Sequence, residues 1–270
     1  MADLLSAERA QYLRQRVRAR RAVLAAQIAL LVFLLLLWEA AARLKWIDPF
    51  ITSSPGRILK TFQNLHASGD LFRHLGVSCL ETVVGFTLGT LLGTLIAILL
   101  WWFPTLSRIL DPYLVVLNSL PKTALGPIFI VWIGAGPAAI IAMTLAISLI
   151  VTILEVHSGF LNVDTGKINL MRTLGASRLQ TLTKLVIPAN AGTFVNALKV
   201  NVGLSWVGVI MGEFLVSRAG LGYLIVYGSQ VFKMDLVMAT VILLLLAAAV
   251  MYQGVLLLER TLKKHLGGSA

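Results

Sequence analysis

Long apolar runs, separated by short polar segments, are the main pattern along this chain. Several of these runs approach the ~20 consecutive apolar residues that an α-helix needs to cross a bilayer. The third run is the least regular, because Pro121, Lys122 and Pro127 interrupt it. The pattern predicts an all-α membrane protein with about six transmembrane helices, at residues 22–42, 76–100, 110–133, 137–156, 194–216 and 235–257.

Composition supports this prediction. Hydrophobic residues make up 58% of the chain and charged residues 13%, whereas soluble domains average roughly 45–50% and about 25%. The single cysteine, Cys79, excludes an intrachain disulfide, and the four histidines show no metal-ligand spacing. The sequence therefore predicts no metal site.

The distribution of Lys and Arg predicts the orientation in the membrane. Six spans place both termini on one side, and Lys and Arg are enriched on the cytoplasmic side. With both termini inside, 15 basic residues lie in inner segments and 7 in outer ones. The chain then divides into a basic cytoplasmic arm (1–21), one transmembrane domain (22–260) and a cytoplasmic tail (261–270). The arm facing anionic lipid explains the net charge of +11 better than binding of nucleic acid does.

A polar, basic segment at about 157–193 separates the fourth and fifth spans and lies on the inner side in this topology. The residues from Asn169 can form a short helix that Gly175 ends, and a second helix can run on to Pro188. Gly175 is expected to adopt a backbone conformation that side chains resist. No Gly-x-x-x-x-Gly-Lys-[Ser/Thr] pattern occurs in the chain, so it has no recognisable ATP site of its own.

The spacing within this segment resembles the EAA loop of ATP-binding-cassette (ABC) importer permeases. The pattern of that loop is Glu-Ala-Ala, three residues, Gly, nine residues, Ile, one residue, Leu-Pro. Gly175 takes the position of the glycine, Leu185 and Ile187 those of the two aliphatic residues, and Pro188 that of the proline. The sequence 169–171, Asn-Leu-Met, replaces the Glu-Ala-Ala.

Residues 120–136, Leu-Pro-Lys-Thr-Ala-Leu-Gly-Pro-Ile-Phe-Ile-Val-Trp-Ile-Gly-Ala-Gly, resemble the nitrate, sulfonate and taurine branch of that family. The branch often runs Pro-Lys-x-Ala-x-x-Pro-Leu-x-x-x-Trp-Phe-Gly-x-Gly. The resemblance covers about 50–260 and implies the type I importer permease fold, as a homodimer in a bacterial inner membrane. It also implies two cytoplasmic ATPase subunits that bind ATP and magnesium, and an extracytoplasmic solute-binding protein. The chain is then a permease subunit that moves solute, and not an enzyme.

By the same resemblance, the loop docks on the ATPase and passes on its motion. Because Asn169 cannot make the charge interactions of the family's glutamate, the contact is expected to rely on Leu170 and its neighbours packing into a groove. The residues expected to couple the two proteins are Asn169, Leu170, Met171, Arg172, Leu174, Gly175, Ala176, Ser177 and Pro188.

Polar residues within the apolar spans are candidates for the solute pathway, because hydrocarbon penalises them. The candidates are Asn118, Ser119, Lys122, Asn201, Ser205 and Glu213. Lys122 is expected to attract an anionic group. Two alternatives stay open. Lys122 lies at the membrane interface if its span starts later, and the three residues of the fifth span form interhelical hydrogen bonds, with Glu213 paired to Arg218.

Gly85, Gly89 and Gly93 repeat every four residues and therefore share one face of the second span. Small residues let another backbone approach closely, since lipid offers no hydrophobic drive for helices to associate. This face packs either within the chain or against a second subunit.

A self-sufficient channel or secondary transporter is the alternative from another functional class. Lys122 and Glu213 would then serve as a gate or proton site. Inverted repeats and paired broken helices would favour this class. The sequence has one interrupted span and no second one that matches it, so it favours the importer.

Overall fold

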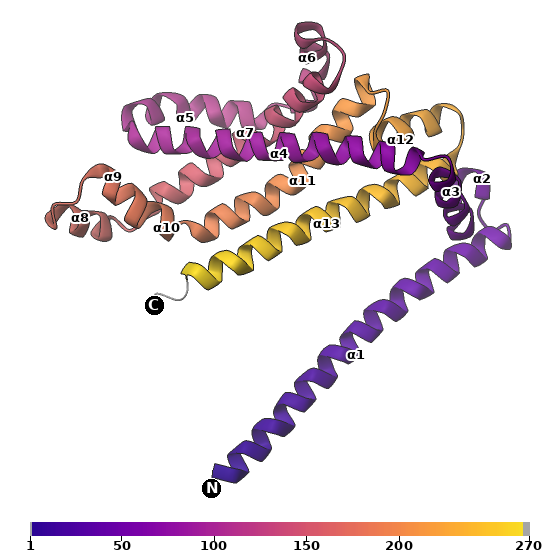
Figure 1. The fold of residues 1–270 in the computed structure, drawn as a ribbon, viewed down its shortest axis with the longest axis horizontal. Helices are drawn as coiled ribbons and strands as arrows, with labels where there is room; N and C mark the ends of the chain where they lie inside the picture. The colour runs from indigo at the N-terminus through magenta and orange to yellow at the C-terminus, as the bar shows by residue number, and fades with distance from the viewer. Residues whose placement is uncertain (1, 267–270) are drawn as a thin grey trace.

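The computed structural model describes residues 2–266, with the backbone alone described at 2–8, 10 and 262–266 (Figure 1). Within that range every regular element is a helix, which confirms the all-α prediction. The elements are α1 (Ala2–Arg43), α2 (Pro49–Thr52), α3 (Pro55–Ala67), α4 (Asp70–Trp102), α5 (Pro104–Ser119), the 3-10 helix η1 (Lys122–Leu125), α6 (Gly126–Ile133), α7 (Pro137–Leu161), α8 (Thr165–Thr173), α9 (Arg178–Thr181), the π-helix η2 (Leu182–Val186), α10 (Ile187–Ala189), α11 (Ala191–Val216), α12 (Leu221–Gln230) and α13 (Met234–Leu266). Residues 267–270 of the predicted tail, and Met1 of the arm, lie outside the described residues.

Five of the described helices, α1, α4, α7, α11 and α13, are long and apolar enough to cross a membrane. They correspond to five of the six predicted spans. Each begins or ends a few residues beyond the apolar run, because a helix continues into the polar interface until a capping or breaking residue stops it.

The span predicted over 110–133, whose apolar run is interrupted at Pro121, is broken at that residue. The chain forms α5 and then η1 with α6, and the two parts are bent by 90°. Pro121 causes the break, because it has no N–H to donate and it pushes the preceding residue out of the helical conformation. Leu120 accordingly has the extended angles φ −66° and ψ 134°. The pair counts as a sixth span only if the bent halves are taken together.

Helix α1 stands apart from the other long helices in Figure 1. The predicted basic arm is helical from Ala2 and continuous with the first span. Near its outer end, the carboxylate of Glu39 accepts hydrogen bonds from Arg43 Nε at 2.7 Å and from the backbone N–H of Gly56 at 2.9 Å. This carboxylate therefore ties the end of α1 to the start of α3. The start of α1 and the end of α13 point toward the left in Figure 1, which is also the side on which α8 and α9 lie.

The centre of the bundle is α7, which packs against α4 on one side and α11 on the other. The three glycines of α4 meet a matching row of small hydroxyl residues on α7. A Cβ atom at Gly85 would lie 2.5 Å from Thr144 Cγ2, and one at Gly93 would lie 2.6 Å from Thr152 Cβ. Gly89 lies in the same way against Ser148. In this structure the glycine face therefore packs within the chain.

A second close approach, which the sequence analysis did not anticipate, joins α7 to α11. A Cβ atom at Gly208 would lie 2.6 Å from the Cα of Thr144, and one at Gly212 would lie 3.0 Å from the Cα of Ile140. Thr144 is fully buried between glycines of two helices. Its hydroxyl donates to Ile140 O at 2.9 Å, so the buried polar atom is satisfied within α7 itself.

At the predicted outer end, α2, α3 and α12 gather around the start of α13 (Figure 1). The carboxylate of Asp235 holds this cap together. It accepts hydrogen bonds from Ser53 Oγ at 2.7 Å and from Arg57 Nη2 at 2.8 Å. Helix α12 was not predicted, because its ten residues are too few to stand out as an apolar run.

Replacing Gly89 with valine is expected to destabilise the bundle by about 1–3 kcal/mol, because the added methyl groups overpack the contact with Ser148. Thermal unfolding of the purified full-length chain in detergent measures this as a lower transition temperature and a smaller monodisperse fraction. Gly254→Val in α13 is the matched control, since a Cβ there meets nothing within 4 Å. Equal effects of the two substitutions would contradict the close packing of α4 on α7.

Candidate functional site

Helix α8 is closed at both ends by local hydrogen bonds. At its start, the side chain of Asp164 accepts a hydrogen bond from the backbone N–H of Gly166 at 2.7 Å. At its end, the N–H of Ala176 donates to Met171 O at 2.9 Å. Between them, Gly175 has a φ of +75°, the left-handed conformation that glycine adopts without strain. The chain therefore reverses direction immediately after α8.

Ser177 restarts the helix beyond this reversal. Its hydroxyl accepts from the N–H of Gln180 at 3.2 Å, while the Gln180 side chain accepts from the N–H of Ser177 at 2.7 Å. This reciprocal pair is a capping box, and it fixes where α9 begins. The helix then continues through η2 and α10 past Pro188. The π-turn immediately before Pro188 accommodates a residue that has no N–H to donate.

The outward surface of α8 is unusually apolar for an exposed helix. Leu170 is 59% exposed and Leu174 is 74% exposed, although both belong to a polar segment. Asn169 and Arg172 are exposed beside them, and Met171 is half-buried. Of the predicted coupling residues, Asn169, Leu170, Met171 and Arg172 lie on α8 and Leu174 caps its end. Gly175, Ala176 and Ser177 form the turn that follows, whereas Pro188 lies further along the chain in α10.

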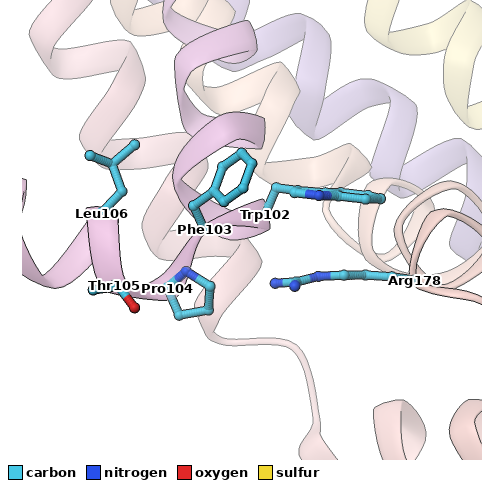
Figure 2. A pocket seen from close by; sticks show the side chains of 6 residues that line it. All are labelled: Trp102, Phe103, Pro104, Thr105, Leu106 and Arg178. Carbon is cyan, nitrogen blue, oxygen red and sulfur yellow. The ribbon is translucent and has the colours of Figure 1, made fainter.

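Arg178 attaches this segment to the bundle. Its guanidinium lies 5.5 Å from the ring centre of Trp101 and 5.3 Å from that of Trp102, at the end of α4. Its Nη2 also donates to the backbone carbonyl of Trp101 at 3.1 Å. Figure 2 shows Arg178 lying flat against Trp102, with Pro104 beside the end of the guanidinium. This contact was not predicted, and its only signal in the sequence is the Trp-Trp pair at the end of an apolar run.

The six predicted pathway residues fall into two groups. Asn118 and Ser119 are exposed and Lys122 is half-buried, all at the break between α5 and η1. Lys122 Nζ donates to Asn118 O at 2.7 Å, and Ser119 Oγ donates to Val115 O at 3.1 Å. Because Pro121 ends the helix here, the Asn118 carbonyl would otherwise lose its hydrogen-bond partner. The Lys122 ammonium thus caps the break and remains open to the surroundings.

Asn201 and Ser205 belong to the second group and are buried in the bundle. The Asn201 amide nitrogen donates to Thr152 Oγ1 at 2.5 Å and to Thr90 Oγ1 at 3.2 Å. Asn201 therefore connects α11 with α7 and α4. For Asn201 this is the interhelical arrangement that the sequence left open as an alternative. Ser205 Oγ, by contrast, is buried with no hydrogen-bond partner among the described residues.

Glu213 is also buried, but its partners differ from the predicted one. Its carboxylate accepts from Ser78 Oγ at 2.5 Å and from the backbone N–H of Gly222 at 2.5 Å. Ser78 Oγ in turn accepts from the N–H of Leu221 at 2.7 Å. The salt bridges among the described residues join other pairs, and none joins Glu213 to Arg218. Glu213 thus fixes the turn between α11 and α12.

Residues 89–264 match the family of proteins described as binding-protein-dependent transport system inner membrane component. The chain is 28% identical over 228 residues to SsuC of Bacillus subtilis, named as an aliphatic sulfonates transport permease protein; the match covers 84% of this chain and 83% of that protein. It is 24% identical over 240 residues to the taurine transport system permease protein TauC of Escherichia coli, with 87% of each chain covered.

A solved structure also resembles this chain. The inward-facing MetNI methionine ABC transporter contains a chain that matches with a TM-score of 0.62 at 20% identity. The match covers 72% of the present chain and 97% of that one. At this level of identity the similarity concerns the fold.

Replacing Glu213 with alanine is expected to free the turn between α11 and α12. The substitution leaves the Ser78 hydroxyl and the Gly222 N–H without their acceptor, which costs about 1–3 kcal/mol for each buried group. Hydrogen exchange followed by mass spectrometry should show faster exchange in the peptide that contains residues 217–222. Ser229→Ala is the control, because Ser229 Oγ donates only within α12, to Ile225 O. Unchanged exchange in Glu213→Ala would show that this carboxylate does not hold the turn.

Proposed function

Because this chain belongs to the family of binding-protein-dependent transport system inner membrane components, we propose that two copies of it form the solute pathway of an ABC importer. The chain is a multi-pass integral membrane protein and a permease subunit of such an importer. In our proposal, two separate ATPase subunits bind ATP and magnesium on the inner side. A solute-binding protein delivers the cargo on the outer side of a bacterial inner membrane.

The exposed leucines of α8 carry this proposal. Leu170 and Leu174 have no partner within the described chain that covers them, and exposed apolar groups of this kind favour a protein contact. The left-handed turn at Gly175 and the capping box at Ser177 hold the helix in one orientation. We propose that α8 inserts into a groove of the ATPase, with the leucines as its anchors.

In this proposal, movement of the ATPase displaces α8, and the displacement reaches the bundle through the contacts that attach α8 and α9 to it. Arg178 links α9 to the end of α4, and Leu182 and Val186 of η2 are buried in the same apolar cluster as Phe160 of α7. A displacement of α8 therefore moves the inner ends of α4 and α7 together. This is a rigid-body transition, in which packed helices shift as a unit.

The solute pathway in our proposal is lined by Asn118, Ser119 and Lys122. These side chains lie at the broken span, and they remain accessible in the folded chain. Asn201, Ser205 and Glu213 are instead proposed to hold the helices that surround the pathway, since all three are buried. A small anionic solute suits the Lys122 ammonium, and the names of the sulfonate and taurine relatives support that class of cargo.

Gly175→Val is expected to uncouple uptake from ATP hydrolysis. A β-branched residue at φ +75° is strained by roughly 1–2 kcal/mol, so the turn after α8 should change its geometry. The measurement compares ATP hydrolysis with solute uptake in vesicles that contain the assembled transporter. Uptake per ATP should fall while membrane insertion is unchanged.

Two variants sharpen this experiment. Gly175→Asn should retain most of the coupling, because asparagine tolerates the left-handed conformation better than other side chains do. Gly192→Val is the matched control, since Gly192 has no positive φ and a Cβ there meets nothing within 4 Å. Full ATP-driven uptake by Gly175→Val would contradict the proposed role of this turn.

Cysteine labelling tests which of the polar residues line the solute pathway and which are buried between helices. In a chain with Cys79→Ala, Asn118→Cys and Ser119→Cys should react with a small water-soluble thiol reagent, and added substrate should slow the reaction. Asn201→Cys and Ser205→Cys should react at least about tenfold more slowly, because a buried thiol is both inaccessible and poorly ionised. Slow reaction at Asn118→Cys and Ser119→Cys in every nucleotide state would remove them from the pathway.

A further inference from the structure

Two hollows open on either side of Arg178 at the predicted inner end of the bundle. One, of about 530 Å³, is lined by Trp102, Phe103, Pro104, Thr105, Leu106 and Arg178 (Figure 2). The other, of about 470 Å³, shares Pro104 and Arg178 with the first and adds Trp101, Leu161, Ile168 and Arg172. Both hollows lie between the α4–α5 turn and the α8–α9 segment with Arg178 in their lining, and together they are called the depression.

The charge in this depression is of one sign. Arg172 and Arg178 are its two charged residues, and no carboxylate lines either hollow. The salt bridges of the described chain involve neither arginine. One Arg178 N–H group donates to Trp101 O, which leaves further donors of the planar guanidinium available. Two guanidinium groups without a carboxylate partner favour an anionic ligand, and phosphate most of all.

The walls of the depression are apolar and aromatic. Trp101 and Trp102 end the transmembrane helix α4, which is where tryptophan marks the boundary between hydrocarbon and headgroups. Phe103 is exposed immediately after them, and Leu106 follows on the first turn of α5. A free phosphate ion gains no favourable contact from apolar walls. A lipid, in contrast, can place its acyl chains against them and its phosphate at the level of the arginines.

We propose that this depression binds the phosphate group of an anionic membrane phospholipid. Arg178 and Arg172 hold the phosphate, and Phe103 and Leu106 contact the upper part of an acyl chain. The cytoplasmic leaflet is rich in anionic lipid, and basic pockets between transmembrane helices are known to accept such headgroups. The bound lipid bridges α4 and α8, so it reinforces the attachment that Arg178 alone makes in the chain.

The test uses the full-length chain assembled with its ATPase subunits, in mild detergent with added phosphatidylglycerol or phosphatidylcholine of identical acyl chains. Native mass spectrometry counts the lipids that remain bound. The assembled protein should retain phosphatidylglycerol about thirtyfold better than phosphatidylcholine, as expected for roughly 1 kcal/mol at each of the two arginines. Arg178→Gln and Arg172→Gln should each remove most of this preference. Lys184→Gln, which removes an exposed positive charge outside the depression, should preserve it.

Fluorescence locates the bound lipid. Brominated phosphatidylglycerol should quench tryptophan emission more than brominated phosphatidylcholine does, and Trp102→Phe should abolish most of that difference. This variant keeps the test decisive if an arginine substitution prevents assembly.

Four results would overturn the proposal. The first is equal retention of the two lipids, and the second is a preference that both arginine variants retain. The third is complete competition by inorganic phosphate, which would identify a site for the free ion. Loss of the lipid when ATPase subunits are added to the isolated chain would also count against it, because the depression would then be a protein contact surface.

Discussion

The structure depends on the close approach of three helices at Thr144. Gly85 of α4 and Gly208 of α11 face this residue from opposite sides, and any side chain at either position would collide with it. In a membrane, helices associate through such contacts and through interhelical hydrogen bonds, since both water and its hydrophobic effect are absent. Asn201 adds the polar component, because its amide reaches threonines of both neighbouring helices.

The α8–α9 segment is attached to this closely packed centre of α4, α7 and α11. The α8–α9 segment is itself stiff, because a left-handed glycine and a capping box fix its turn. Between the two rigid parts lies a single cation stacked on tryptophan, together with a few buried aliphatic residues of η2. If α8 docks on an ATPase as we propose, contacts of this number and kind can pass a displacement on to the bundle while still permitting small rotations.

The elements that depend on local patterns could be predicted from the sequence. Apolar run length identified the five long helices, glycine spacing identified one face of α4, and the irregular run at Pro121 marked the position of the break without its 90° bend. Contacts between distant segments left no local signal. Ser78 lies 135 residues before Glu213, and Trp101 lies 77 residues before Arg178, so neither pairing follows from spacing. A buried glutamate finds whichever donors the fold brings near it, and here these came from α4 and a backbone turn rather than from the neighbouring arginine.

The continuity of α1 has a consequence for the biogenesis of the protein. Its 42 residues would extend about 63 Å at 1.5 Å per residue, roughly twice the hydrocarbon thickness of a bilayer. The most apolar 18-residue window of this helix does not rely on the bundle, since none of it is buried. The arginines that precede it belong to the same rod. Helix α1 therefore combines a topological signal and an anchor in one rod that precedes every other described helix, so it can be oriented in the membrane without any contact to them.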